Sequence, residues 1–123
     1  MRARDLARFT AICRLAIGAG FVAYPPLSMR SWIGSDARRP GAILLARALG
    51  ARDLVIGVGT LASLADRRAL SPWLRGALAA DATDLALTLA GGDAVPARGK
   101  VLVCAVAAGG VALGAAALAT LEE

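Results

Sequence analysis

Charged residues interrupt long apolar stretches of this chain, and they restrict its possible folds more than any other feature. Arg47, Arg52 and Asp53 interrupt the apolar run 42–64, and Asp81 and Asp84 interrupt the run 73–90. A charge at the centre of a bilayer costs roughly 2.5–3.5 kcal/mol, whereas each Leu, Ile, Phe or Val there contributes only about −0.3 to −0.6 kcal/mol. Such residues therefore need partners inside a helix bundle, and they mark a candidate site.

The composition is typical of a membrane protein. Of 123 residues, 58% are hydrophobic before the 14 glycines are counted, whereas soluble domains contain about 45–50% apolar residues with glycine included. Aromatic residues make up only 4%, and a mixture of Ala, Leu, Val and Gly favours close contact between helices in lipid. We predict a single integral membrane domain over residues 1–123.

The charges and the missing histidine exclude several classes of site. The net charge is +5, but the arginines lie at the ends of apolar runs or inside them, without the basic face and stacking aromatics that bind nucleic acid. There is no His, which is the commonest metal ligand and neutral-pH acid–base group. Cys13 and Cys104 fall in different predicted spans, so we expect no disulfide and no zinc site. The sequence predicts no cofactor, no metal and no catalytic residue.

Four membrane spans are predicted, at 9–24, 42–64, 73–91 and 101–121. Pro25 and Pro26 end the first span, because proline lacks the backbone N–H and restricts the residue before it. Ser71 and Pro72 suit the N-cap and first helical position of the third span, which ends at 91–92. The sequence therefore predicts an all-α fold, an antiparallel up-down four-helix transmembrane bundle. A cleaved signal peptide is the alternative for the first span, although Arg14 interrupts its apolar core.

The location that we predict is the inner (plasma) membrane, with several passes. The positive-inside rule discriminates poorly, because basic residues occur on both sides of the predicted bundle. The basic N-terminus favours both termini in the cytoplasm.

Small residues mark the faces where helices are expected to pack. Gly50 and Gly57 share a stripe with Asp53 in the second span, at spacings of three and four. Gly110 and Gly114 form a GxxxG pair in the last span. That pair allows close backbone approach, either within one chain or at a dimer face.

The charged residues are expected to form one buried cluster. Matching depths at about 1.5 Å of rise per residue pairs Arg47 with Asp84, Arg52 with Asp81, and Arg14 with Asp53. Three Arg and three Asp make a neutral set, as a buried network requires. Such a cluster either fixes helix register and topology, or lines a polar cavity for an anionic or polar head group, since the Arg fork binds carboxylate or phosphate in two places.

Two more specific chemical interpretations fail on the residues present. The segment 81–84, Asp-Ala-Thr-Asp, is similar to the start of the CDP-alcohol phosphotransferase signature, but Leu85-Ala86-Leu87 follows where that signature has Gly and Ala-Arg. The small multidrug transporters are also four-span chains, but they carry a Glu in the first span where this chain has Arg14.

A closer resemblance covers nearly the whole chain. The segment 47–57, Arg-Ala-Leu-Gly-Ala-Arg-Asp-Leu-Val-Ile-Gly, follows a first span containing Arg-Leu-Ala-Ile-Gly at 14–18. Together they resemble a family of uncharacterised four-span bacterial membrane proteins, common in actinobacteria and catalogued as domain of unknown function 4267. Only the Arg-x-x-Gly-x-Arg-Asp block is specific. The resemblance implies a fold and a location, and no activity.

Two functions remain open on the sequence. The first is an accessory or scaffold protein that contacts membrane lipids, a second copy or a larger membrane partner. The second is a small membrane enzyme or carrier that acts on a lipid-linked or anionic substrate through the cluster. A cavity open at Asp53 and Asp81 favours the second, and a closed, mutually paired cluster favours the first.

Overall fold

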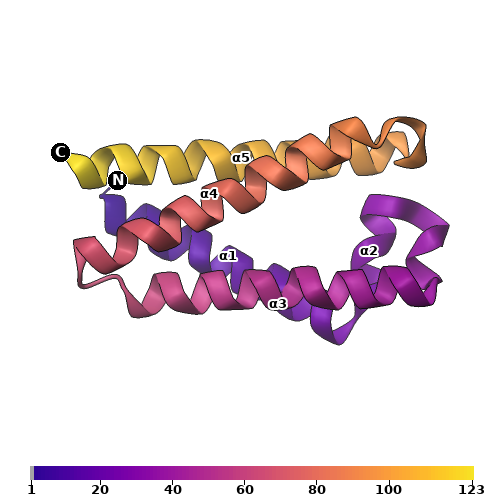
Figure 1. The fold of residues 1–123 in the computed structure, drawn as a ribbon, viewed down its shortest axis with the longest axis horizontal. Coiled ribbons are helices and arrows are strands. Elements are labelled where there is room, and N and C mark those ends of the chain that lie inside the picture. Colours follow the sequence, from indigo (N-terminus) through magenta and orange to yellow (C-terminus); the bar gives the residue numbers. More distant parts are fainter. Residues whose placement is uncertain (1) are drawn as a thin grey trace.

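The computed structural model describes residues 2–123, and these form helices with no strand. The α-helices are α1 (Ala3–Ala23), α2 (Pro25–Ile33), α3 (Pro40–Ala62), α4 (Arg67–Ala90) and α5 (Ala97–Glu122), with 3₁₀ helices η1 (Gly34–Arg38) and η2 (Gly92–Ala94). The predicted all-α class is confirmed. The four long helices run back and forth, so both termini and the connection 63–66 lie at one end, and the connections 34–39 and 91–96 lie at the other (Figure 1).

Proline and glycine set most of the helix boundaries, as the sequence predicts. α1 ends at Ala23, and Pro25 then opens α2. Pro40 opens α3, where its missing N–H leaves no bond unmade. α4 ends at Ala90, and Gly92 follows with a φ of +54°, a conformation that favours glycine.

The predicted start of α4 is wrong. The helix begins at Arg67 and not at Ser71, because the Asp66 side chain accepts a hydrogen bond of 2.8 Å from the backbone N–H of Arg68 and so caps the helix there. Pro72 therefore lies inside the helix, where it removes one backbone hydrogen bond. The carbonyl left without a partner is that of Arg68, four residues earlier. Both Pro72 and Arg68 are exposed, so this carbonyl lies near solvent.

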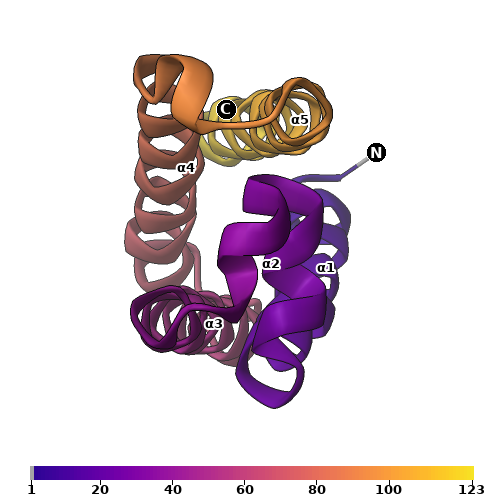
Figure 2. The same cartoon turned by 90° about the vertical axis from the view of Figure 1, so that its right-hand side faces the viewer.

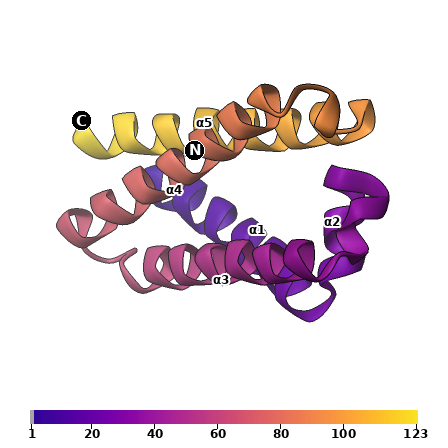
Figure 3. The ribbon, with the colours of Figure 1, turned by 45° about the vertical axis from the view of Figure 1, so that its right-hand side comes forward.

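The long helices form two pairs, in which α1 packs mainly on α3 and α4 packs mainly on α5. Seen along the long axis, the four lie around a common centre, and α2 covers one end between α1 and α3 (Figure 2). Apolar side chains from α1, α4 and α5 form a core at the end that holds the termini: Ala3, Leu6, Ala7, Leu70, Leu74, Ala117 and Leu121. A second core lies under α2 and centres on Met29, Ala37 and Ala46. Between the two cores, α4 starts beside the end of α3 and diverges from it toward α5 (Figure 3).

Glycines let the helices of each pair approach closely. A Cβ added to Gly50 would lie 2.6 Å from the backbone oxygen of Gly18, and one added to Gly18 would lie 2.7 Å from the backbone oxygen of Gly50. α1 and α3 therefore meet backbone to backbone at this point. Gly57 packs in the same way against Leu15, farther along the same interface.

Replacing Gly50 with alanine is expected to lower the free energy of unfolding by about 1–3 kcal/mol, because the new methyl meets backbone that cannot rotate away. Gly41→Ala in the same helix is the matched control, since an added Cβ there meets nothing within 4 Å. Denaturation in mixed detergent micelles, followed by circular dichroism, compares the two. Equal stability of both variants would show that α1 and α3 are not in contact at Gly50.

Large apolar side chains remain exposed on all four long helices. They include Ile12 on α1, Val55 on α3, Leu87 on α4 and Val101 on α5. By length and composition, two of the helices, α1 and α5, are able to cross a membrane.

Candidate functional site

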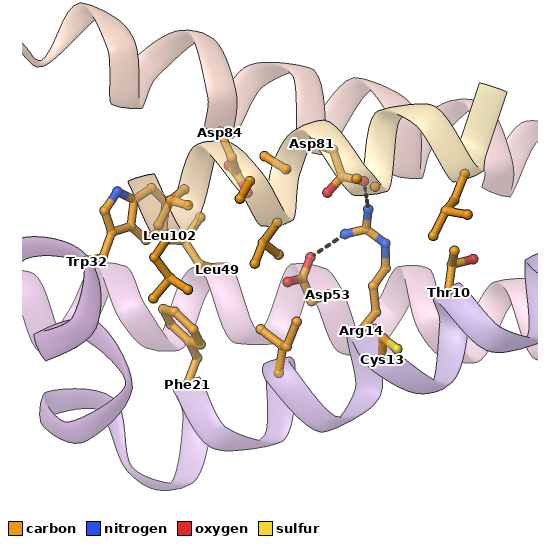
Figure 4. A pocket seen from close by; sticks show the side chains of 18 of the residues that line it. Thr10, Cys13, Arg14, Phe21, Trp32, Leu49, Asp53, Asp81, Asp84 and Leu102 are labelled. Carbon is orange, nitrogen blue, oxygen red and sulfur yellow. Dashed lines mark hydrogen bonds and ion pairs between the residues drawn. The ribbon is translucent and has the colours of Figure 1, made fainter. Parts of the chain in front are cut away.

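Arg14 connects three helices through the middle of the molecule. From α1 its Nη1 donates to Asp53 Oδ1 of α3 at 2.8 Å, and its Nη2 donates to Asp81 Oδ2 of α4 at 2.5 Å (Figure 4). Nη2 also donates to the backbone oxygen of Ala77, one turn before Asp81, at 3.0 Å. Both terminal nitrogens of Arg14 are therefore engaged by acceptors of the protein.

Arg52 of α3 forms the second connection to α4. Its Nη1 and Nη2 donate to the two oxygens of Asp84 at 2.9 and 2.7 Å, which is the two-pronged geometry that the guanidinium favours. Nη2 also lies 3.3 Å from Asp53 Oδ1. Its remaining nitrogen, Nε, is buried and has no hydrogen-bond partner in the described chain. These two arginines and their three carboxylate partners form the cluster: Arg14, Arg52, Asp53, Asp81 and Asp84. The exposed fractions of their side chains range from 10% for Arg14 to 29% for Arg52.

Of the three predicted pairs, only Arg14 with Asp53 forms. Asp81 pairs with Arg14 instead of Arg52, and Asp84 pairs with Arg52 instead of Arg47. Arg47 is exposed and has no carboxylate partner among residues 2–123.

The angular positions on α3 explain why Arg47 lies outside the cluster. Arg52 lies about 100° from Asp53 around the helix axis, and Arg47 lies about 120° from Asp53 in the opposite sense. α4 lies on the Arg52 side, as the Arg52–Asp84 pair requires. The predicted pairs were chosen by the depth of each residue along its helix, which takes no account of its angular position around the helix axis.

The cluster joins the two helix pairs and is not electrically balanced. Within the cluster, each ion pair to α4 comes from α1 or α3, so these contacts cross from one helix pair to the other. Without Arg47 the cluster holds two guanidinium groups and three carboxylates. If every group is ionised, it therefore carries one uncompensated negative charge.

Two carboxylate oxygens of the cluster accept no hydrogen bond from residues 2–123. They are Asp53 Oδ2 and Asp81 Oδ1, since each residue uses only its other oxygen toward Arg14. Neither is among the fully enclosed atoms that lack a partner. They are therefore at least partly accessible, and both residues line a cavity.

The cavity has a volume of about 480 Å³ and lies between α1 and α5, with the cluster along one wall (Figure 4). Its rim carries apolar side chains that are themselves exposed, among them Phe9 at 55%, Ile17 at 41%, Leu102 at 46% and Val106 at 55%. A polar wall and an apolar, open rim thus belong to one cavity.

Glycines of α5 shape this wall. Gly110 lies directly against the Asp81 carboxylate, so that a Cβ at this position would overlap it. Gly109 also lines the cavity, but an added Cβ there meets nothing within 4 Å. Gly114 is in ordinary contact distance of Leu78 of α4. Both glycines of the GxxxG pair thus face α4 of the same chain.

Sequence reasoning missed the cavity residues that carry no charge. Phe21 and Trp32 lie at one end of the cavity, and Thr10 lies toward the other (Figure 4). The sequence feature that could have identified Thr10 and Phe21 is their spacing from Arg14, which places all three on one face of α1. Trp32 lies on α2, a helix that the four-span prediction did not contain.

Metal ligands and thiols are the other side chains that could carry chemistry here. In the part of the chain that the structure describes, no three His, Cys, Asp or Glu side chains lie close enough to hold a metal ion. Cys13 lines the cavity as a free thiol, and Cys104 is half-buried and also free. Comparison with known proteins finds no matching family model, no matching curated protein and no matching solved structure.

Proposed function

We propose that this chain is a multi-pass membrane protein that binds an amphiphile in the cavity between α1 and α5. α1, α3, α4 and α5 cross the bilayer as an antiparallel four-helix bundle, and α2 with η1 lies at one interface. Their 21, 23, 24 and 26 residues give lengths of about 31–39 Å, enough for a hydrocarbon layer of about 30 Å. Their exposed apolar side chains then face lipid tails.

The positions of the other charges support this arrangement. Exposed charges gather at the helix ends and connections, as Arg39, Asp66 and Asp93 illustrate. Arg47 lies two turns inside α3, where its long side chain reaches back to the interface. The basic N-terminus favours both termini in the cytoplasm. The inner-membrane location belongs to the same proposal, as does the resemblance to the four-span family, domain of unknown function 4267.

The observation that carries the binding function is the joining of a charged wall to an apolar rim in one cavity. A closed cluster that only fixes helix register needs no such space. An amphiphile places its polar group at the wall and lets its chain leave between α1 and α5 into the bilayer. Apolar pockets with a few convergent polar groups are where ligands bind.

An accessory or scaffold role is the second candidate, and the ion pairs that join the two helix pairs favour it. Under that role the cluster holds the bundle together for a membrane partner or a second copy, and the cavity holds only lipid. An enzyme or carrier acting on a bound substrate would use the same cavity.

The topology is tested by cysteine labelling in intact cells, with Cys13 and Cys104 replaced by alanine. Ser35→Cys and Asp93→Cys are expected to react on one side of the membrane, and Asp66→Cys on the other, because these exposed residues lie at opposite ends of the molecule. Labelling of Ser35→Cys and Asp66→Cys from the same side would contradict four crossings.

The binding site is tested by filling the cavity. Gly109→Leu places a side chain in open cavity space and is expected to remove most of the lipid or amphiphile that co-purifies, as measured by native mass spectrometry. Gly76→Leu on α4 is the matched control, because its added Cβ also meets nothing within 4 Å but Gly76 lies outside the cavity lining. Identical adducts on the native protein and both variants would overturn the proposed site.

A further inference from the structure

We propose that the amphiphile bound in this cavity carries a protonated primary amine. This rests on the proposed function and names the class of ligand. The cluster of Arg14, Arg52, Asp53, Asp81 and Asp84 lacks one positive charge, and a ligand cation supplies it. A buried charge without a partner is unfavourable, so the imbalance selects for a ligand that removes it.

Both guanidinium groups are already paired with carboxylates of the cluster. Arg14 uses Nη1 and Nη2 on Asp53, Asp81 and the Ala77 carbonyl. Arg52 uses its two terminal nitrogens on Asp84, and its Nε is enclosed. A phosphate or carboxylate would compete with these carboxylates for the same guanidinium groups and would add a second uncompensated negative charge. The anionic substrate expected from the sequence is therefore disfavoured.

The acceptors that remain suit an ammonium group. Asp53 Oδ2 and Asp81 Oδ1 accept no hydrogen bond from residues 2–123, and the two carboxylates that carry them flank Arg14 and line the cavity (Figure 4). A primary ammonium has three N–H donors and one positive charge, so it offers donors for these acceptors and the charge that balances the cluster. A quaternary ammonium supplies the charge without the donors, and an alcohol supplies a donor without the charge.

The rim suits an apolar chain on the same molecule. Ile17 of α1 and Leu102 and Val106 of α5 are exposed beside the opening. A chain that extends from the ammonium between these helices remains in apolar surroundings. The same head chemistry occurs in a free alkylamine and in the ethanolamine head group of a phospholipid, which adds a phosphate that must remain outside the cluster.

The test compares matched ligands on the unaltered protein by native mass spectrometry, with Gly109→Leu as the blank for adsorption outside the cavity. Decylamine is expected to bind about tenfold more tightly than decanol, because a charge-assisted hydrogen bond exceeds a neutral one by about that factor. Decyltrimethylammonium and decanoate are expected to bind more weakly than decylamine. In the lipid arm, dioleoylphosphatidylethanolamine is compared with dioleoylphosphatidylcholine, its trimethylated counterpart.

Asp81→Asn balances the cluster at two charges of each sign, so it is expected to remove the preference for amine over alcohol. Asp93→Asn, at an exposed site, makes the same change in net charge and is expected to keep that preference. If Asp81→Asn does not fold, Asp53→Asn replaces it, and the ligand comparison on the native protein needs neither variant.

Each outcome is decisive. A preference for decylamine or for the ethanolamine lipid supports the proposal and identifies the source of the amine. Equal binding of decylamine and decanol, both blocked by Gly109→Leu, overturns the amine while the amphiphile site stands. It would mean that a proton or a small cation balances the cluster. Binding that Gly109→Leu does not affect overturns the site itself.

Discussion

Replacing Arg14 with methionine is expected to lower the free energy of unfolding by about 3–5 kcal/mol, the usual effect of removing one partner from a buried ion pair. Methionine keeps the apolar stem of the side chain and removes the guanidinium. Asp53 and Asp81 then remain buried with the Arg14 donors gone, and the cluster changes from one excess negative charge to two. Unfolding in mixed detergent micelles, followed by circular dichroism, measures the loss.

Two companion variants separate charge from packing. Arg47→Met removes an exposed arginine that has no carboxylate partner among residues 2–123, and it is expected to change stability by less than about 0.5 kcal/mol. Adding Asp53→Asn and Asp81→Asn to Arg14→Met removes the stranded carboxylates and is expected to recover much of the loss. If Arg14→Met is as stable as Arg47→Met, Arg14 is not buried in the cluster.

The boundaries of the helices were readable from the sequence because they depend on local chemistry. A proline after Tyr24 or Arg39 acts on its own neighbours, whatever the rest of the chain does. The start of α4 was missed because two local signals competed. Asp66 caps the helix first, and the helix tolerates Pro72 inside it at the loss of one exposed hydrogen bond.

The membership of the cluster was mostly predictable, but its pairings were not. Charges inside apolar stretches need partners, and this rule selected Arg14, Arg52, Asp53, Asp81 and Asp84. It also selected Arg47, which the structure leaves exposed and outside the cluster. Which carboxylate meets which guanidinium depends on the rotation and tilt of whole helices, and both are set by contacts such as that of Gly18 with Gly50. The cavity depends on the same tilt, because α1 and α5 belong to different packed pairs. No pattern within a single helix encodes that separation.

The cluster supports both a structural and a binding role, because different atoms serve each. The guanidinium nitrogens and the carboxylate oxygens that pair with them join α1 and α3 to α4. The carboxylate oxygens that remain unpaired belong to residues that line the cavity. A variant that destabilises the bundle therefore says little about binding, whereas one that fills the cavity or balances the charge tests binding directly.

Replacing Gly110 with alanine is expected to lower the free energy of unfolding by about 3 kcal/mol, the lower end for a broken buried ion pair. The new methyl would occupy the position of the Asp81 carboxylate. The carboxylate must then leave Arg14, or α5 must move away from α4, and either change breaks contacts in the middle of the molecule. The same denaturation measurement reports the loss.

The neighbouring glycine provides the control. Gly109→Ala adds the same methyl to the same helix one residue earlier, where it meets nothing within 4 Å, and it is expected to raise stability by at most about 1 kcal/mol through helix propensity. In an Asp81→Ala background the overlap is absent, so the effect of Gly110→Ala is expected to fall below about 1 kcal/mol. That coupling distinguishes a clash with the carboxylate from general crowding between α4 and α5, because crowding would persist when Asp81 is gone. A Gly110→Ala effect that is the same in both backgrounds would place the Asp81 side chain away from α5, and the wall of the cavity with it.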